Sequence, residues 1–306
     1  MGFVMMKVSF QKYIVFIFIP IFAIAALLYY VASNNVEQFY QQETELAVTS
    51  INSADTLIQQ YLLGLRRNVG HFTSHYYDDL QQLVDDPDDT ALYQRVRDSV
   101  DMYFPSAATF TIADSQGNVL LNDVDILVGT GCRENIRLFS ISSQQSDAQL
   151  RIHSDRLNYH FDIMHEMRTT DGRVIVFFVS FEPQDIAGYV SNLQLPGHQM
   201  VIIKKDADSL IEVTKDGARV KLAREKNLAP SELDRVLAKK DVSNTLWQLV
   251  DIIEEERISQ AKFIVFRDFG IIFSSFVLGT LLAFIAIMKH EKMRFHAESK
   301  LDQHTR

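Results

Sequence analysis

Two long apolar segments constrain the fold of this chain. Residues 13–32 (YIVFIFIPIFAIAALLYYVA) and 269–288 (FGIIFSSFVLGTLLAFIAIM) each contain 20 residues without a charged side chain. At a rise of about 1.5 Å per residue, a helix of about 20 residues crosses a hydrocarbon core of about 30 Å. The first segment is longer than the apolar stretch of about 7–15 residues in a cleavable signal peptide, which favours a retained anchor. We therefore predict two transmembrane helices.

The charged residues beside these segments predict their orientation. The flanking basic residues lie outside both spans: Lys7, Lys12, Lys289, Lys292 and Arg294. After the first span, no Lys or Arg occurs before Arg66. By the positive-inside rule, residues 1–12 and 289–306 are cytoplasmic and residues 33–267 lie on the opposite side. In a Gram-negative bacterium, this arrangement corresponds to the inner membrane with residues 33–267 in the periplasm.

The composition is that of a folded chain and argues against several classes of function. Hydrophobic residues make up 47% and charged residues 23%, close to the average for globular proteins. The net charge is −9 and no basic patch is present, so we predict no nucleic-acid partner. The single cysteine, Cys132, excludes an intrachain disulfide and a cysteine-based zinc site. We expect neither a metal nor a cofactor.

A long helix is predicted to leave the first span. Neither Pro nor Gly occurs between Ala23 and Leu63, and apolar residues recur there at steps of three and four. This spacing predicts one continuous helix that ends between Gly64 and Gly70. The acidic turn around Pro87 then predicts a new helix over residues 90–102.

After residue 105 the apolar pattern alternates, which predicts strands. The predicted elements, in chain order, are a hairpin of 108–113 and 118–122, strands at 149–153, 159–167 and 173–181, a helix at 183–192, strands at 200–204 and 210–214, a helix from Ser231, and a strand at 245–252. Together with the long helix, these elements predict an α+β fold built on antiparallel sheets.

The helix rising from the first span, the hairpin FTIADSQGNVLLND at 110–123, the central sheet and the return strand SNTLWQLVDI at 243–252 resemble the Cache branch of PAS-like sensors. More narrowly, five segments resemble the sensor half of bacterial membrane-anchored GGDEF proteins (diguanylate cyclases and their relatives). These segments are GTGCRENIRLF at 129–139, YHFDIM at 159–164, VFFVSF at 176–181, PGHQMVII at 196–203 and LIEVTKDGAR at 210–219. The resemblance covers residues 1–306, and the tail HAESKLDQHTR is similar to the helical stalk that leads into a GGDEF domain.

The resemblance and the residue patterns together imply a PAS/Cache-like periplasmic sensor between two transmembrane helices. The predicted parts are a cytoplasmic N-terminus at 1–12, a transmembrane helix at 13–32, a long helix and helical region at 33–104, a PAS/Cache-like module at 105–182, a smaller second module with a return helix at 183–267, a transmembrane helix at 269–288 and a cytoplasmic helical tail at 289–306.

The chain lacks the catalytic signatures of the GGDEF proteins that it resembles, and this difference determines the activity that we expect. The chain contains no GGDEF, GGEEF or EAL signature and no histidine-kinase segment. The 18 residues after Met288 are too few to bury a core. We therefore expect no enzyme. The resemblance implies a receptor that senses a small periplasmic ligand, forms a homodimer and signals through its membrane helices to a cytoplasmic output partner. Either the chain is a free-standing sensor or it is a fragment.

The candidate ligand site lies on a predicted hairpin over residues 150–163. With a loop at 155–158, His153 pairs with His160 and Arg151 pairs with Asp162. Because side chains alternate along a strand, these four residues share one face, opposite a face with Leu150, Ile152, Phe161 and Ile163. An arginine and an aspartate suit an anionic or zwitterionic ligand.

Two alternatives remain for this face. A solvated sheet face would carry the same Arg151–Asp162 pair without any ligand. His153, His160 and Asp162 are also a set that ligates zinc, although their spacing matches no strong motif. His71 and His75 have a helical i, i+4 spacing that can bind metal but is more typical of a surface.

Arg133 is a further candidate ligand-binding residue. The segment GTGCR at 129–133 is consistent with a helix that begins near Arg133 and receives an anion. It is more typical of a glycine-rich turn in which Cys132 is buried as a small apolar side chain.

The alternative function is that of a periplasmic scaffold, such as a polysaccharide chain-length regulator. Such proteins resemble this chain in topology only. Their second span typically carries a proline-rich motif. Residues 269–288 contain no proline, and the strand-rich middle favours the sensor.

Overall fold

The computed structural model describes residues 2–121, 129–142, 150–154, 159–207 and 209–304. The chain divides into two compact units. We call Met1–Gln42 with Glu255–Arg306 the helical unit, and Glu43–Glu254 the central unit.

Two long helices supply the helical unit. Helix α1 (Gly2–His75) begins there and continues into the central unit, and α7 (Glu255–His304) follows the central unit in the chain. By length and apolar composition, both helices are capable of crossing a membrane. Large apolar side chains are exposed on both of them: Phe22, Leu27, Tyr29, Ile271, Leu278 and Leu282. These observations agree with the two predicted apolar helices.

Helix α1 is longer than predicted, because it continues through Gly64 and Gly70 to His75. A glycine inside a helix costs only about 1 kcal/mol relative to alanine, so packing can override it. At Gly70 a Cβ atom would meet the His165 imidazole at 3.2 Å. The missing side chain therefore lets α1 approach the sheet at this position.

Two short helices follow α1. Helix α2 (Tyr77–Asp85) was not predicted from the sequence, whereas α3 (Thr90–Tyr103) confirms the helix predicted after Pro87. The Asp89 carboxylate caps α3 by accepting a hydrogen bond from the Leu92 N–H at 2.9 Å.

The first sheet has the antiparallel order β1-β4-β3-β2. Its strands are β1 (Ala107–Asp114), β2 (His153–Ser154), β3 (Tyr159–Arg168) and β4 (Val174–Phe181). The chain turns after β1 at Gly117, which has φ 84°. The predicted return strand is reduced to a single bridge between Ala113 and Val119, and Asn122 lies outside the described residues.

The second sheet has the order β7-β6-β5-β9-β8. Its strands are β5 (His198–Lys204), β6 (Ile211–Thr214), β7 (Gly217–Ala218), β8 (Val236–Asp241) and β9 (Trp247–Ile253). The helices near it are α5 (Gln184–Leu193), the 3-10 turn η2 (Arg219–Lys221) and the single turn α6 (Pro230–Leu233). Strand β8 and the two-residue β7 were not predicted.

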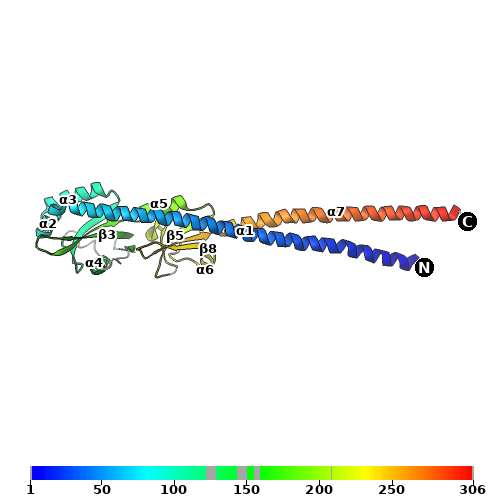
Figure 1. Cartoon of the computed structure of the whole chain (residues 1–306), viewed down its shortest axis with the longest axis horizontal. Helices are drawn as coiled ribbons and strands as arrows, with labels where there is room; N and C mark the ends of the chain where they lie inside the picture. The colour runs from blue at the N-terminus through cyan, green and yellow to red at the C-terminus, as the bar shows by residue number, and fades with distance from the viewer. Residues whose placement is uncertain (1, 122–128, 143–149, 155–158, 208, 305–306) are drawn as a thin grey trace. The chain divides into compact units, whose positions relative to one another are not determined.

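The two faces of the first sheet differ in chemistry. On the face towards α1, Phe72 stacks on Phe177 at 5.4 Å between ring centroids, and Phe110 and Phe181 belong to the same core. Helix α4 (Thr130–Ser142) contacts β3 from the other side, and Figure 1 shows α1 and α4 on opposite sides of β3. The candidate site lies between β3 and α4.

Candidate functional site

A row of polar side chains crosses the α4-facing side of the first sheet. Thr109 of β1 is paired with Ser180 of β4, and Ser180 is paired with Asp162 of β3. Directly opposed residues project from the same face, so the three side chains form one transverse row. His160 precedes Asp162 by two residues and shares this face.

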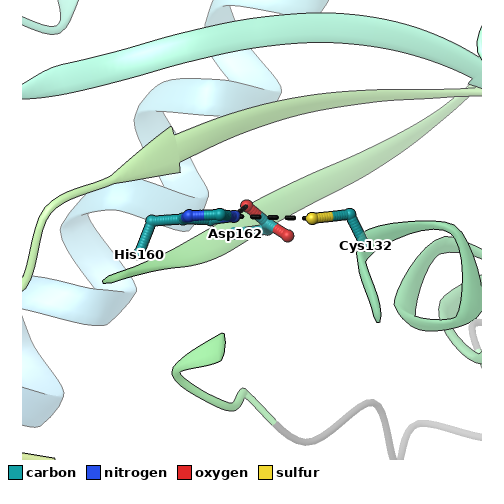
Figure 2. A group of neighbouring side chains, drawn as sticks. All are labelled: Cys132, His160 and Asp162. Carbon is teal, nitrogen blue, oxygen red and sulfur yellow. Dashed lines mark hydrogen bonds and ion pairs between the residues drawn. The ribbon is translucent and has the colours of Figure 1, made fainter. Parts of the chain in front are cut away.

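Helix α4 adds Cys132 to this row. Figure 2 shows Cys132 pointing from α4 towards His160 and Asp162 on β3. The Cys132 Sγ lies 3.4 Å from the His160 Nε2, and the same nitrogen lies 3.7 Å from the Asp162 Oδ1. The Ser180 hydroxyl donates a hydrogen bond of 2.6 Å to that carboxylate oxygen. We call Cys132, His160, Asp162 and Ser180 the α4–β3 cluster.

The α4–β3 cluster is buried. The exposed fractions are 2% for Cys132, 6% for His160, 4% for Asp162 and 2% for Ser180. Burying a carboxylate and an imidazole is costly unless specific partners compensate for the lost water. The alternative of a solvated sheet face is therefore wrong for His160 and Asp162.

Further polar atoms near this face lack partners among the described residues. The Thr109 Oγ1, the Thr111 Oγ1 and the Arg151 Nε are buried without a hydrogen bond there. Thr111 is paired with Phe178, two positions along β1 from Thr109, so it projects from the same face. A buried polar group without a partner costs about 1–3 kcal/mol. A polar ligand would offset that cost.

The predicted hairpin register is confirmed, because His153 pairs with His160 and Ser154 with Tyr159. The side chain of His153 and the predicted loop at 155–158 lie outside the described part of the chain. Arg151 is half-buried and precedes β2, so its predicted pairing with Asp162 is not part of the β2–β3 ladder.

Arg133 lies on α4 directly after Cys132 and is half-buried. Helix α4 begins at Thr130, so the favoured interpretation of residues 129–133 as a glycine-rich turn is wrong. Cys132 is nevertheless buried, as that second interpretation required.

The exclusion of a zinc site containing cysteine needs correction. That expectation rested on the presence of a single cysteine, but the ligand atoms of Cys132, His160 and Asp162 lie within 4.8 Å of one another. A mixed sulfur, nitrogen and oxygen set needs only one cysteine. The alternative pair, His71 and His75, is exposed on α1.

A second buried cluster was missed from the sequence. His198 of β5 is fully buried, with its Nδ1 2.6 Å from the Asp251 Oδ1 and its Nε2 3.0 Å from the Glu43 Oε2. The cluster joins α1, β5 and β9. Burial lowers the pKa of His198, but the hydrogen bonds and negative charges of Asp251 and Glu43 outweigh it, so the pKa is raised.

Two signals could have revealed this second cluster. Glu43 stands four residues before Ala47, on the buried stripe of α1 that continues to Ile51. Asp251 interrupts the apolar segment WQLVDII of β9. A charged residue at a core position of a helix or strand calls for a buried partner.

No family model matches the chain, and no curated protein matches it. Among solved structures, the chain is similar to the ligand-binding domain of Mlp24 with asparagine, at 16% identity and a TM-score of 0.45, covering 74% of this chain and 98% of that one. It is similar to the periplasmic domain of Vibrio cholerae LuxQ, at 12% identity and a TM-score of 0.46, covering 69% and 99%.

A third similar structure is the ligand-binding domain of the Pseudomonas aeruginosa amino acid chemoreceptor PctC with GABA. The identity is 14% and the TM-score 0.43, covering 66% of this chain and 94% of that one. Mlp24, LuxQ and PctC are thus represented by ligand-binding or periplasmic domains. Each of these three TM-scores is below 0.5, so the similarities carry no argument about function.

Proposed function

We propose that this protein is an inner-membrane signal-transduction receptor whose central unit binds a small ligand between β3 and α4. The observation that carries the proposal is the buried polar row of the first sheet. Asp162 and Ser180 lie in this row with Thr109, whose hydroxyl has no partner among the described residues. The two exposed apolar helices support the membrane location. The basic flanking residues support cytoplasmic termini and a periplasmic location for residues 33–267.

The residues of this face, together with Arg151 from the segment before β2, suit a polar ligand. The Asp162 carboxylate accepts hydrogen bonds from a cationic or N–H donor, and the Arg151 guanidinium binds an anionic group. The hydroxyls of Thr109 and Thr111 supply two further donors. Burial strengthens each of these contacts, because the effective dielectric constant is lower than in water.

Signal transmission is proposed to run through the helices that enter and leave the central unit. Helix α1 continues from the helical unit into the central unit, and α7 begins at Glu255, two residues after β9 ends. A ligand that binds two states with different affinity shifts the balance between them, and small helix displacements are an established form of such a change.

We further propose that the receptor acts as a homodimer and passes its signal to a cytoplasmic output partner. Exposed apolar residues on α1 of the central unit, Leu46, Leu57 and Leu63, suit contact with a second copy. The resemblance to GGDEF sensors supports an output in c-di-GMP signalling, and we propose that catalysis resides in the partner.

Ligand binding can be tested by a thermal-shift screen of the full chain in detergent micelles. The probes are amino acids, organic acids, polyamines and divalent metal ions. A ligand at 100 times its Kd stabilises the folded state by about 2.7 kcal/mol, which gives a measurable rise in Tm. If a broad screen of well-folded protein shows no shift, the receptor proposal fails and the scaffold alternative gains support.

The Thr111→Val variant shows whether a ligand found in this way occupies the proposed face. Valine keeps the shape but removes the unsatisfied hydroxyl, so we expect equal or higher stability without ligand and an affinity lower by about 1–3 kcal/mol. Thr56→Val removes an exposed hydroxyl on α1 and should leave affinity unchanged. Equal affinity in both variants would place the ligand elsewhere.

A further inference from the structure

We infer that Cys132, His160 and Asp162 bind a divalent transition-metal ion of the zinc type. The inference rests on the proposed function, because it specifies the class of ligand that the face between β3 and α4 receives. The three ligand atoms come from two elements and lie within 4.8 Å of one another.

The distances fit tetrahedral coordination. Zinc bonds of about 2.3 Å to sulfur and about 2.05 Å to nitrogen, at a tetrahedral angle, place the two ligand atoms about 3.5 Å apart. The Cys132 Sγ and the His160 Nε2 are separated by 3.4 Å. Nitrogen and oxygen ligands of the same ion lie about 3.4 Å apart by the same construction. The His160 Nε2 and the Asp162 Oδ1 are separated by 3.7 Å.

The types of ligand select the ion. Thiolate sulfur and imidazole nitrogen favour zinc and neighbouring transition metals, whereas magnesium and calcium prefer sites made of oxygen ligands. Three protein ligands also leave a fourth position open for water or a small molecule. Such a site suits reversible binding better than a closed set of four ligands.

The surroundings hold the ligands in place. The Ser180 hydroxyl donates to the Asp162 carboxylate at 2.6 Å, which fixes its orientation. All three ligand residues are buried, so water competes weakly for the ion. A divalent cation between the carboxylate and the thiolate would balance their negative charges.

The test uses Co²⁺ as a spectroscopic probe of the full chain, purified in detergent micelles and treated with a chelator. We expect one equivalent of Co²⁺ to bind with a thiolate-to-metal charge-transfer band. Zn²⁺ should displace it, and excess Mg²⁺ or Ca²⁺ should not. The band should disappear in Cys132→Ser and His160→Gln. Ser180→Ala should weaken Co²⁺ affinity about 10–100-fold, the range found for residues that orient metal ligands.

His71→Ala is the matched control, because it removes an exposed histidine from α1 and should leave the titration unchanged. If Cys132→Ser does not fold, Asp162→Asn keeps the side-chain shape and tests the site by a loss of Co²⁺ affinity, because the thiolate remains but the anionic oxygen ligand is lost. The inference is overturned if the wild-type chain shows no charge-transfer band, or if the band survives in Cys132→Ser. If an organic ligand raises the Tm of a chain that shows no Co²⁺ band, the metal inference is overturned. The receptor proposal is then supported.

Discussion

His198 is enclosed by two carboxylates that come from different elements of the central unit. Asp251 lies at its Nδ1 and Glu43 at its Nε2, and all three residues are buried. Breaking a buried ion pair by removing one partner costs about 3–5 kcal/mol, because the remaining charge is left without compensation. His198 should therefore be a large contributor to the stability of the junction between α1 and the second sheet.

Stability should depend on pH through His198. Burial lowers the pKa of His198, but its hydrogen bonds to Asp251 and Glu43 and their negative charges together raise it above the ordinary value of 6.5. A histidine with a raised pKa stabilises the folded state fully below about pH 6.5, and this contribution is lost as the pH rises through the folded pKa. Thermal unfolding between pH 6 and pH 9 should show this loss in the wild type and not in His198→Gln.

His165 provides a control, because its pKa is shifted in the opposite direction to that of His198. Burial lowers its pKa, only partly offset by the charge of Glu166. The contribution of His165 to the stability of the folded state is therefore present above pH 6.5 and is lost as the pH falls through the lowered pKa. His165→Gln should alter the acidic side of the stability profile only. An unchanged alkaline slope in His198→Gln would contradict the role assigned to His198.

At the level of single residues, the alternation of side chains along a strand predicted the common face of two of the four residues in the α4–β3 cluster. It placed His160 and Asp162 on one face, opposite Phe161, because the period of a strand is fixed. It did not bring Cys132 to them, because that contact depends on how α4 packs, 28 residues earlier in the chain. Nor did alternation show that the hydroxyl oxygens of Thr109 and Thr111 are buried.

The elements differ in how far the sequence predicted them. Strands β3 and β4 were predicted because their apolar residues alternate or run continuously. Strand β8 was missed because its sequence, VLAKKD, carries lysines, as is common at the exposed edge of a sheet. At residues 129–133 the sequence favoured a turn over the start of helix α4, because the two glycines there weaken the helical pattern.

The position of α4 should depend on Gly117. This residue has φ +84°, and a Cβ atom there would meet the carbonyl oxygen of Arg133 at 2.5 Å. Gly117→Ala therefore forces the first turn of α4 to move, with Cys132 in it. We expect a loss of more than about 1 kcal/mol in unfolding free energy and weaker Co²⁺ binding.

Gly172→Ala is the matched control, because Gly172 has φ +87° but, apart from its two chain neighbours, no described residue comes within 4 Å of its Cβ position. It should cost only about 1 kcal/mol of backbone strain and leave Co²⁺ affinity unchanged. Equal losses of Co²⁺ affinity in the two variants would show that the turn at Gly117 does not position α4.

For the whole molecule, the proposed topology can be tested by cysteine labelling in a Cys132→Ser background. Ser231 is exposed in the central unit, and Lys292 is exposed on α7 beyond the second apolar segment. A thiol reagent that does not cross the inner membrane should label Ser231→Cys in intact cells and Lys292→Cys only after lysis. Labelling of Lys292→Cys in intact cells would contradict the positive-inside assignment.

The contact between Glu43 and His198 joins residues that are 155 positions apart in the chain. In the proposed topology, α1 is translocated before β5 and β9, so its buried stripe cannot pack until these strands follow. Contacts of such long range form late, and apolar surface that waits for them is prone to aggregation. In this topology, folding of the central unit should therefore depend on chaperones that shield α1 until β9 has been translocated.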